Sequence, residues 1–177
     1  MLHHYFKEEF PLILRPLRAD DIEDIRRWRN LDYIRNNFIS NEIITPIEQK
    51  EWFNKYKVIE NDFIFIIEET NVIQKKIGTV SIYNFSRSSN IAEFGRFIIG
   101  EADAQGKGYG VRAAIMACEL AFKQLGVEKL FLEVFADNMA GRHVYTKVGF
   151  REYDERMENG RRLIFMELTK VYSQILR

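Results

Sequence analysis

A glycine-bearing turn, Gln105-Gly106-Lys107-Gly108-Tyr109-Gly110, stands between an apolar segment and a long helical pattern. Glycines allow backbone amides to approach a ligand because no Cβ obstructs them. The first amides of the following helix have no intrahelical partner and lie at the positive end of the helix dipole. These residues could therefore bind a phosphate or pyrophosphate. A plain glycine turn leading into a helix is the alternative interpretation.

Two familiar phosphate-binding motifs are excluded by individual residues. A P-loop requires a Ser or Thr after its Lys to bind Mg²⁺, whereas Lys107 is followed by Gly108. The dinucleotide fingerprint G-x-G-x-x-G would need a glycine where Val111 stands. That fingerprint also belongs early in a fold that continues with further β-α units.

A second segment, DNMAGRHVYTKVGF, runs from Asp137 to Phe150. It is similar to the D-N-x-x-A-x-x-L-Y-x-x-x-G-F segment of the GNAT superfamily of acyl-CoA N-acyltransferases. Gln105-x-x-Gly108-x-Gly110 likewise resembles that superfamily's Q/R-x-x-G-x-G/A motif. The order and separation of the motifs agree, and so does the order of elements over nearly the whole chain. Gly141 and Val144 are departures, standing where alanine and leucine are usual.

The resemblance implies a mixed sheet whose central strands splay apart to admit the pantetheine arm of acetyl-CoA. By analogy, Phe97, Ile98 and Ile99 pair with the pantetheine, and Asn138 contacts the cofactor arm. Tyr145 would lie near the sulfur. The amides that would hold the pyrophosphate belong to seven consecutive residues: Gln105, Gly106, Lys107, Gly108, Tyr109, Gly110 and Val111.

Attack of an amine on a thioester expels a thiolate, which a positioned acid can protonate. A tyrosine of pKa about 10 is protonated at neutral pH, so Tyr145 is the candidate acid. The amine must be neutral to attack, and Glu93 is the candidate base on the strand before the glycine turn. Pairing of Glu93 with an arginine is the alternative interpretation. The base could equally act through water or be Asp137.

The acceptor side resembles a branch that acetylates amino groups of nucleotide-linked sugars. The resemblance rests on Arg26-Arg27-Trp28-Arg29-Asn30 and on Ile44-Thr45-x-x-Glu48-Gln49-x-x-Trp52-Phe53. Arginines near this site would suit a diphosphate. The same branch includes enzymes acting on ribosomal-protein N-termini and on polyamines, and a polyamine site would use carboxylates such as Glu42, Glu48 and Glu51. A catalytically silent acyl-CoA-binding module is an alternative of another class.

The elements that must position these residues form an α/β (α+β) pattern, predicted as a mixed, mostly antiparallel sheet with helices on both faces. Asp20 or Asp21 is expected to cap the first helix, and Thr45-Pro46-Ile47-Glu48 reads as a capping box for the second. Gly126 should end the helix of residues 108–125, and Asn159-Gly160 should turn a final hairpin. The predicted strands are residues 12–17, 63–67, 77–83, 92–99 and 130–135, with a last helix at residues 139–148.

The composition fits one soluble domain over residues 1–177. The chain has a mass of 21.0 kDa and carries 26 basic and 26 acidic residues, so its net charge of zero argues against nucleic-acid binding. Cys118 is the sole cysteine, and the three histidines His3, His4 and His143 have no metal-ligand spacing, which argues against disulfides and metal sites. No apolar run approaches the roughly 20 residues of a membrane span. We expect a cytoplasmic protein with a small-molecule partner, whose edge strands would allow a homodimer.

Overall fold

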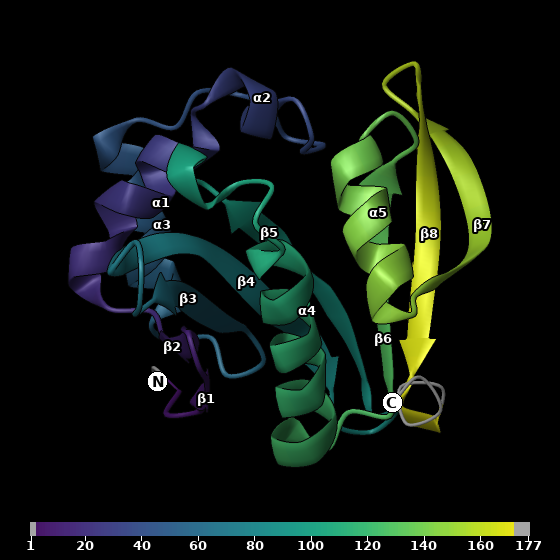
Figure 1. Ribbon diagram of the computed structural model, residues 1–177. Helices are drawn as coiled ribbons and strands as arrows, with labels where there is room; N and C mark the ends of the chain where they lie inside the picture. The colour runs from purple at the N-terminus through teal and green to yellow at the C-terminus, as the bar shows by residue number, and fades with distance from the viewer. Residues whose placement is uncertain (1–2, 172–177) are drawn as a thin grey trace.

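The computed structural model describes residues 3–171 and is built on one eight-stranded sheet (Figure 1). The strands lie in the order β1-β2-β3-β4-β5-β6-β8-β7, and only the β5–β6 pair is parallel. This confirms the predicted mixed, mostly antiparallel sheet. The strands are β1 Lys7–Glu9, β2 Leu12–Pro16, β3 Phe63–Glu69, β4 Lys75–Ser86, β5 Ile91–Ile99, β6 Lys129–Phe135, β7 Arg151–Glu158 and β8 Arg161–Thr169.

Helices cover both faces of the sheet, and β3 shows this most directly. Its odd-numbered residues 63, 65 and 67 pack in one core cluster with α4 (Tyr109–Leu120) and α5 (Met139–Val148). Residues 64 and 66 pack in another cluster with α1 (Ile22–Arg29), α2 (Asp32–Arg35) and α3 (Pro46–Tyr56). A strand buried on both faces reads as a continuous apolar run, as residues 63–67 do. Figure 1 shows α4 lying against the sheet, separate from the α1–α3 layer.

Several local signals act as predicted. The Thr45 amide donates to the Glu48 carboxylate at 2.8 Å, and Thr45 Oγ1 accepts from the Glu48 amide at 3.3 Å, which completes the capping box of α3. Gly126 ends its helix with φ of 75°. Asn159 and Gly160 turn the β7–β8 hairpin with φ of 50° and 75°. Positive φ at both positions is the signature of a type I′ hairpin turn.

The predicted helix of residues 108–125 differs in its last turn. Regular α-helix ends at Leu120, and the chain continues as a π-helical segment, Ala121–Leu125, before Gly126. The short strand β1 at one edge of the sheet was not predicted. The stretch from Arg29 to Asn41 reads from the sequence as a loop or an irregular helix, and α2 forms within it. With β1 and β7 as the sheet edges, the homodimer stays a prediction.

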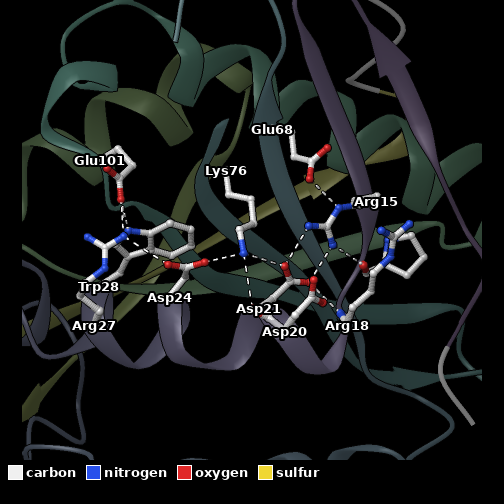
Figure 2. A network of polar contacts seen from close by, with 11 residues as sticks. Arg15, Arg18, Asp20, Asp21, Asp24, Arg27, Trp28, Glu68, Lys76 and Glu101 are labelled. Atoms are coloured by element: carbon white, nitrogen blue, oxygen red, sulfur yellow. Dashed lines mark hydrogen bonds and ion pairs between the residues drawn. The ribbon is translucent and has the colours of Figure 1, made fainter. Parts of the chain in front are cut away.

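The prediction that Asp20 or Asp21 caps α1 is wrong, because neither side chain bonds to the first amides of that helix. Asp21 directly precedes α1, yet its carboxylate accepts from the Arg15 guanidinium at 2.7 and 2.8 Å and from Lys76 at 3.2 Å (Figure 2). Although burial by itself raises the pKa of Asp21, the Arg15 hydrogen bonds and charge outweigh it and hold the pKa below its usual value. Asp21 therefore fastens the start of α1 to β2 and β4 rather than capping α1.

A bulge interrupts β5 on its β4 side. Arg96 and Phe97 together oppose the single residue Val80 of β4. Arg96 has φ of 45°, a region that non-glycine residues seldom occupy, and Thr79 Oγ1 donates to the Arg96 carbonyl at 2.9 Å. The bulge interrupts the ladder here and bends the strand.

On its other side, β5 separates from β6. The two strands pair only from Ile91 to Glu93 of β5, opposite Lys129 to Phe131 of β6. Beyond these residues each strand continues without the other, and Figure 1 shows β5 and α4 diverging from β6 and α5. The splayed central strands implied by the family resemblance are confirmed.

Candidate functional site

A cavity of about 620 Å³ lies under the α1–α3 layer and reaches through the sheet where β5 and β6 separate. Two of its residues, Phe94 and Tyr145, belong to the core on the face covered by α4 and α5, the α4/α5 face. Ser81, Glu93 and Glu133 also line it. Side chains alternate along a strand, so these three point to the face covered by α1 and α3, the α1/α3 face. The cavity therefore joins both faces of the sheet.

Tyr145 lies at the α4/α5 end of this cavity. Its ring is buried among Phe94, Phe97 and Phe150, with centroid distances of 5.9, 6.3 and 6.0 Å. Its hydroxyl has no hydrogen-bond partner among residues 3–171. Burial raises the pKa of Tyr145, so the hydroxyl stays protonated at neutral pH. The side chain is held rigidly and retains a free proton donor.

The glycine turn leads into α4 as expected for an anion site. Gly106 and Gly108 have φ of 71° and 79°, and a Cβ added at either residue would meet nothing within 4 Å. Gly108 is the N-cap of α4, and no side chain of the described region caps the helix there. Val111 lies in the first turn, where amides lack intrahelical partners. Lys107 is exposed beside the two glycines, so the cradle is open to solvent.

The link from β5 to the turn folds into a short 3₁₀ segment, Ala102–Ala104. The carboxamide of Gln105 then donates to the Ile99 carbonyl at 3.2 Å and to the Tyr33 hydroxyl of α2 at 3.1 Å. Gln105 thus ties the turn back to the end of β5. It also joins the turn to the α1–α3 layer.

The three strand residues predicted beside the pantetheine divide between the two faces. Phe97 and Ile99 pack against the α4/α5 core, and both lie within 3.6 Å of where a Cβ on Gly110 would be. Ile98 is buried in the α1/α3 cluster instead. Tyr109 is partly buried and also packs against the α4/α5 core.

Asn138 lines the cavity and also begins α5. Its Oδ1 accepts from the Gly141 amide at 3.0 Å, which makes it the N-cap of that helix. A Cβ at position 141 would lie 2.7 Å from Asn138 Nδ2. The glycine that replaces the family's usual alanine therefore makes room for the Asn138 carboxamide in this orientation.

Glu93, the candidate base, lies on the α1/α3 face. It accepts hydrogen bonds from the Tyr83 hydroxyl and from Asn84 Nδ2, the latter at 2.9 Å. These partners replace the arginine considered from the sequence. Glu133 lies on the neighbouring strand, and burial, with further contributions from Glu93 and Glu158, raises its pKa. Two carboxylates thus gather on one wall of the cavity.

Asp137, the other base considered, is engaged elsewhere. Its carboxylate accepts from the Arg161 guanidinium at 2.6 and 3.1 Å, and this pairing lowers its pKa. Its side chain is largely exposed, and it is not among the cavity-lining residues of the described chain. This geometry favours Glu93 over Asp137.

The arginine-rich end of α1 sends one side chain to the cavity. Arg26 pairs with Glu23, and Arg27 pairs with Asp24 and Glu101. Arg29 lines the cavity, stacks over the Phe38 ring at 3.5 Å and donates to the Ser40 carbonyl. Its Nη1 is buried with no partner among the described residues. Burial and the charge of Arg96 lower the Arg29 pKa to about 10, so it remains a cation at neutral pH.

Among the residues of the cavity wall that sequence reasoning missed are Tyr83, Glu133 and Ser81. Glu133 lies between the apolar residues Leu132 and Val134 of β6, and Ser81 lies between Val80 and Ile82 of β4. A polar residue in a buried strand is costly unless it is paired. A polar residue between apolar neighbours was the available signal, but only the paired strands show that both residues face one cavity.

The described region offers no group of three or more His, Cys, Asp or Glu side chains that could hold a metal ion. Within residues 3–171, no helix is both long and apolar enough to cross a membrane.

Several known proteins are similar to this chain. Spermidine N(1)-acetyltransferase of Escherichia coli (strain K12) is 28% identical over 144 residues, covering 81% of this chain and 75% of the relative. The structure of spermidine N-acetyltransferase from Vibrio cholerae with CoA and spermine has a TM-score of 0.84 at 24% identity, covering 94% of this chain and 99% of that one. Apo FdhC, a nucleotide-linked sugar GNAT, has a TM-score of 0.82 at 26% identity, covering 98% and 94%.

The model of the acetyltransferase (GNAT) domain matches residues 11–151. This span contains the glycine turn at the start of α4, the separated β5 and β6, and the segment from Asp137 to Phe150 that carries Tyr145. The chain therefore belongs to the acetyltransferase (GNAT) domain family and is an N-acetyltransferase.

Proposed function

We propose that this enzyme transfers the acetyl group of acetyl-CoA to the primary amine of a nucleotide-linked amino sugar. The observation that carries the choice of acceptor is Arg29. Arg29 lines the cavity, and its buried Nη1 has no hydrogen-bond partner in the described chain. Among residues 3–171 it also has no carboxylate partner. A planar guanidinium binds a phosphate through two parallel hydrogen bonds. A diphosphate on the acceptor would provide oxygen atoms that accept hydrogen bonds from this guanidinium.

The residues proposed for the cofactor fit its chemistry. Gly106 and Gly108 form an open cradle at an uncapped helix start, which suits a pyrophosphate. The remaining proposed contacts are Gln105, Lys107, Tyr109, Gly110 and Val111 in the turn, Phe97, Ile98 and Ile99 on β5, and Asn138 and Tyr145 beyond β6. Phe97 and Ile99 line the side on which the strands part, so the proposed arm would run between β5 and β6.

Acetyl-CoA supplies the thioester that the amine attacks. In the proposed mechanism, Glu93 accepts a proton from the ammonium group of the acceptor on the α1/α3 face. Tyr145 donates its hydroxyl proton to the departing sulfur on the α4/α5 face. The two residues lie on opposite faces of the sheet yet line one cavity, so an acid and a base could act from two sides of a reacting carbonyl.

A polyamine is the second candidate acceptor. The neighbouring carboxylates Glu93 and Glu133 would attract a cationic chain, and Glu42 also lines the cavity. The 28% identity to the Escherichia coli spermidine acetyltransferase supports the same candidate. Two of the carboxylates that the sequence suggested for a polyamine site contribute little to such a site. Glu48 is engaged with Thr45 in the capping box, and Glu51 is not among the cavity-lining residues of the described chain.

The deciding experiment measures acetyl-CoA-dependent thiol release with a nucleotide-linked amino sugar, spermidine and a ribosomal-protein N-terminal peptide. Arg29→Met should raise KM for the nucleotide sugar by about 10- to 100-fold, the value of a charge-assisted hydrogen-bonded pair. It should leave KM for acetyl-CoA unchanged. Arg87→Met, which alters an exposed arginine, is the control. Turnover of spermidine alone would reject the sugar acceptor and support the polyamine. Binding of acetyl-CoA without turnover of any amine would support a silent module.

A further inference from the structure

We infer that Gln49 and Ser81 form a polar subsite that recognises an oxygen atom on the acceptor, a hydroxyl or a carbonyl close to the amine. This inference deepens the proposed function and rests on it for the choice of acceptor. It identifies two specificity-determining residues that take no part in the chemistry itself. Both line the same cavity, one from α3 and one from β4.

Gln49 lies in the first half of α3, on the side that faces the cavity. The residue is 4% exposed, and its Nε2 is buried without a hydrogen-bond partner among residues 3–171. Its neighbours on α3 behave differently, because Trp52 stacks on Tyr56 and Glu48 belongs to the capping box. Gln49 alone on this helix presents a buried polar group to the cavity with nothing in the described chain to satisfy it.

Ser81 approaches the same space from the sheet. It is fully buried, at 0% exposure, and its Oγ likewise lacks a partner in the described part of the chain. It pairs in register with Gly95, the residue directly before the bulge at Arg96. Thr79, the next residue on the same face of β4, donates its hydroxyl to the Arg96 carbonyl and is satisfied. The hydroxyl of Ser81 is thus left for a ligand.

Leaving a buried polar group without a hydrogen bond is costly, and two such groups on one cavity wall would be costlier still. A sugar hydroxyl or an amide carbonyl can accept from Gln49 Nε2 and also pair with the Ser81 hydroxyl. A polyamine cannot do the same, because its methylene groups form no hydrogen bonds and its ammonium groups only donate. The subsite therefore selects for an oxygen-bearing amine and against a plain alkyl amine.

The test compares two nucleotide-linked amines, of which only one carries hydroxyl oxygens close to the amine. One is a nucleotide-linked amino sugar, and the other is the same nucleoside diphosphate carrying an aminohexyl chain. Ser81→Ala and Gln49→Met should each lower kcat/KM and affinity for the sugar by about tenfold, the value of one hydrogen bond to a buried group. Neither should alter kcat/KM for the aminohexyl compound or KM for acetyl-CoA. Calorimetric titration provides the affinities independently of turnover.

Stability measurements separate recognition from a structural role. Ser81→Ala removes a buried hydroxyl that has no partner, so the free energy of unfolding of the free enzyme should stay the same or rise. Ser86→Ala, on the same strand but bonded to Ser88 and Ser89, is the matched control. Gln124→Met, on an exposed residue of the π-helical segment, is the control for Gln49.

Equal losses with both acceptors, or no loss with either, would overturn the subsite. The proposed function fails in a different way, namely if neither nucleotide compound binds while another amine is acetylated. In that case the same two variants are compared on a free amino sugar and on spermidine. A selective loss with the amino sugar would still support the subsite, whereas unchanged rates with both amines would reject it.

Discussion

The indole Nε1 of Trp28 donates a 2.7 Å hydrogen bond to Glu101 Oε1, across 73 residues of sequence (Figure 2). Trp28 belongs to α1 in the layer over the acceptor cavity, and Glu101 begins the link that leads into the glycine turn. Arg27 and Lys75 also bind this carboxylate, at 2.5 and 2.8 Å. Trp28 and Arg27 thus join α1 to the start of this link, and the Gln105–Tyr33 hydrogen bond joins the turn itself to α2.

Glu101 should make the stability of the enzyme depend on pH in the acid range. Burial alone would raise its pKa, but hydrogen bonds from Lys75, Trp28 and Arg27 lower it to about 2 from the ordinary 4.5. A carboxyl group whose pKa falls on folding stabilises the protein at pH values above the pKa that the group has in the unfolded chain. That contribution is lost as pH falls from about 4.5 to 2. Denaturant unfolding of Glu101→Gln should show a flatter pH dependence here, whereas Glu60→Gln should follow the wild type.

Gly100→Ala should destabilise the fold strongly. A Cβ at this position would overlap Cγ and Cδ1 of the fully buried Trp28 indole, which cannot move aside. We expect a loss of about 1–3 kcal/mol or more in the free energy of unfolding. Gly110→Ala is the matched comparison, because its Cβ would lie 3.6 Å or more from its neighbours and inside a helix. Chemical denaturation should show Gly110→Ala to be neutral or stabilising, and equal losses would contradict this packing.

Tyr145→Phe should lower kcat about 100-fold, the scale of a lost general acid. Acetyl-CoA affinity and the free energy of unfolding should barely change, because the ring packing is retained and the hydroxyl bonds to no described residue. Steady-state kinetics with calorimetric titration of acetyl-CoA would separate the two quantities. Tyr153→Phe, on an exposed tyrosine of β7, is the control. An unchanged kcat would remove Tyr145 from the mechanism.

Glu93→Gln should lower kcat/KM for the amine by about 100-fold, since the variant cannot accept the ammonium proton. The amide keeps the size of the carboxylate and its contact with Asn84, so the fold should be retained. Initial rates across a pH series would measure the effect. Glu133→Gln changes the neighbouring carboxylate and should lower kcat/KM for the amine by a smaller factor. If the two variants lost activity equally, the proton would be shared by the pair.

Gly108→Ala should weaken acetyl-CoA binding, whereas Gly126→Ala should not. Both glycines adopt positive φ, and a Cβ at either would meet nothing within 4 Å. Each substitution should therefore cost about 1–2 kcal/mol of stability for the left-handed backbone. Only Gly108 lies at the amide cradle, so only its Cβ would project into the proposed pyrophosphate site. Isothermal titration at a temperature where both variants are folded gives the comparison, and equal affinities would move the pyrophosphate elsewhere.

The sequence alone determined the features that depend on neighbours along the chain. The Thr45 capping box, the positive φ at Gly126 and the Asn159-Gly160 hairpin are set within a few residues, so local chemistry predicts them. The paired motifs at Gln105 and Tyr145 likewise indicated the family, because each is a contiguous pattern. The mixed, mostly antiparallel sheet was predicted from the order of strands and helices along the chain.

Tertiary structure decided which groups share a site. Asp21 has the residue type and position of a helix cap, but its carboxylate binds Arg15 and Lys76 instead of the helix amides. These partners are preferred because a buried charge must be paired. Glu133 and Ser81 come from strands far apart in sequence, and they line one cavity only because β5 and β6 part beside them. Whether Arg29 or Arg27 faces the cavity depends on which arginine finds a carboxylate across the fold. Contacts between residues so far apart in sequence have no signature in the local sequence, so they could not be predicted from it.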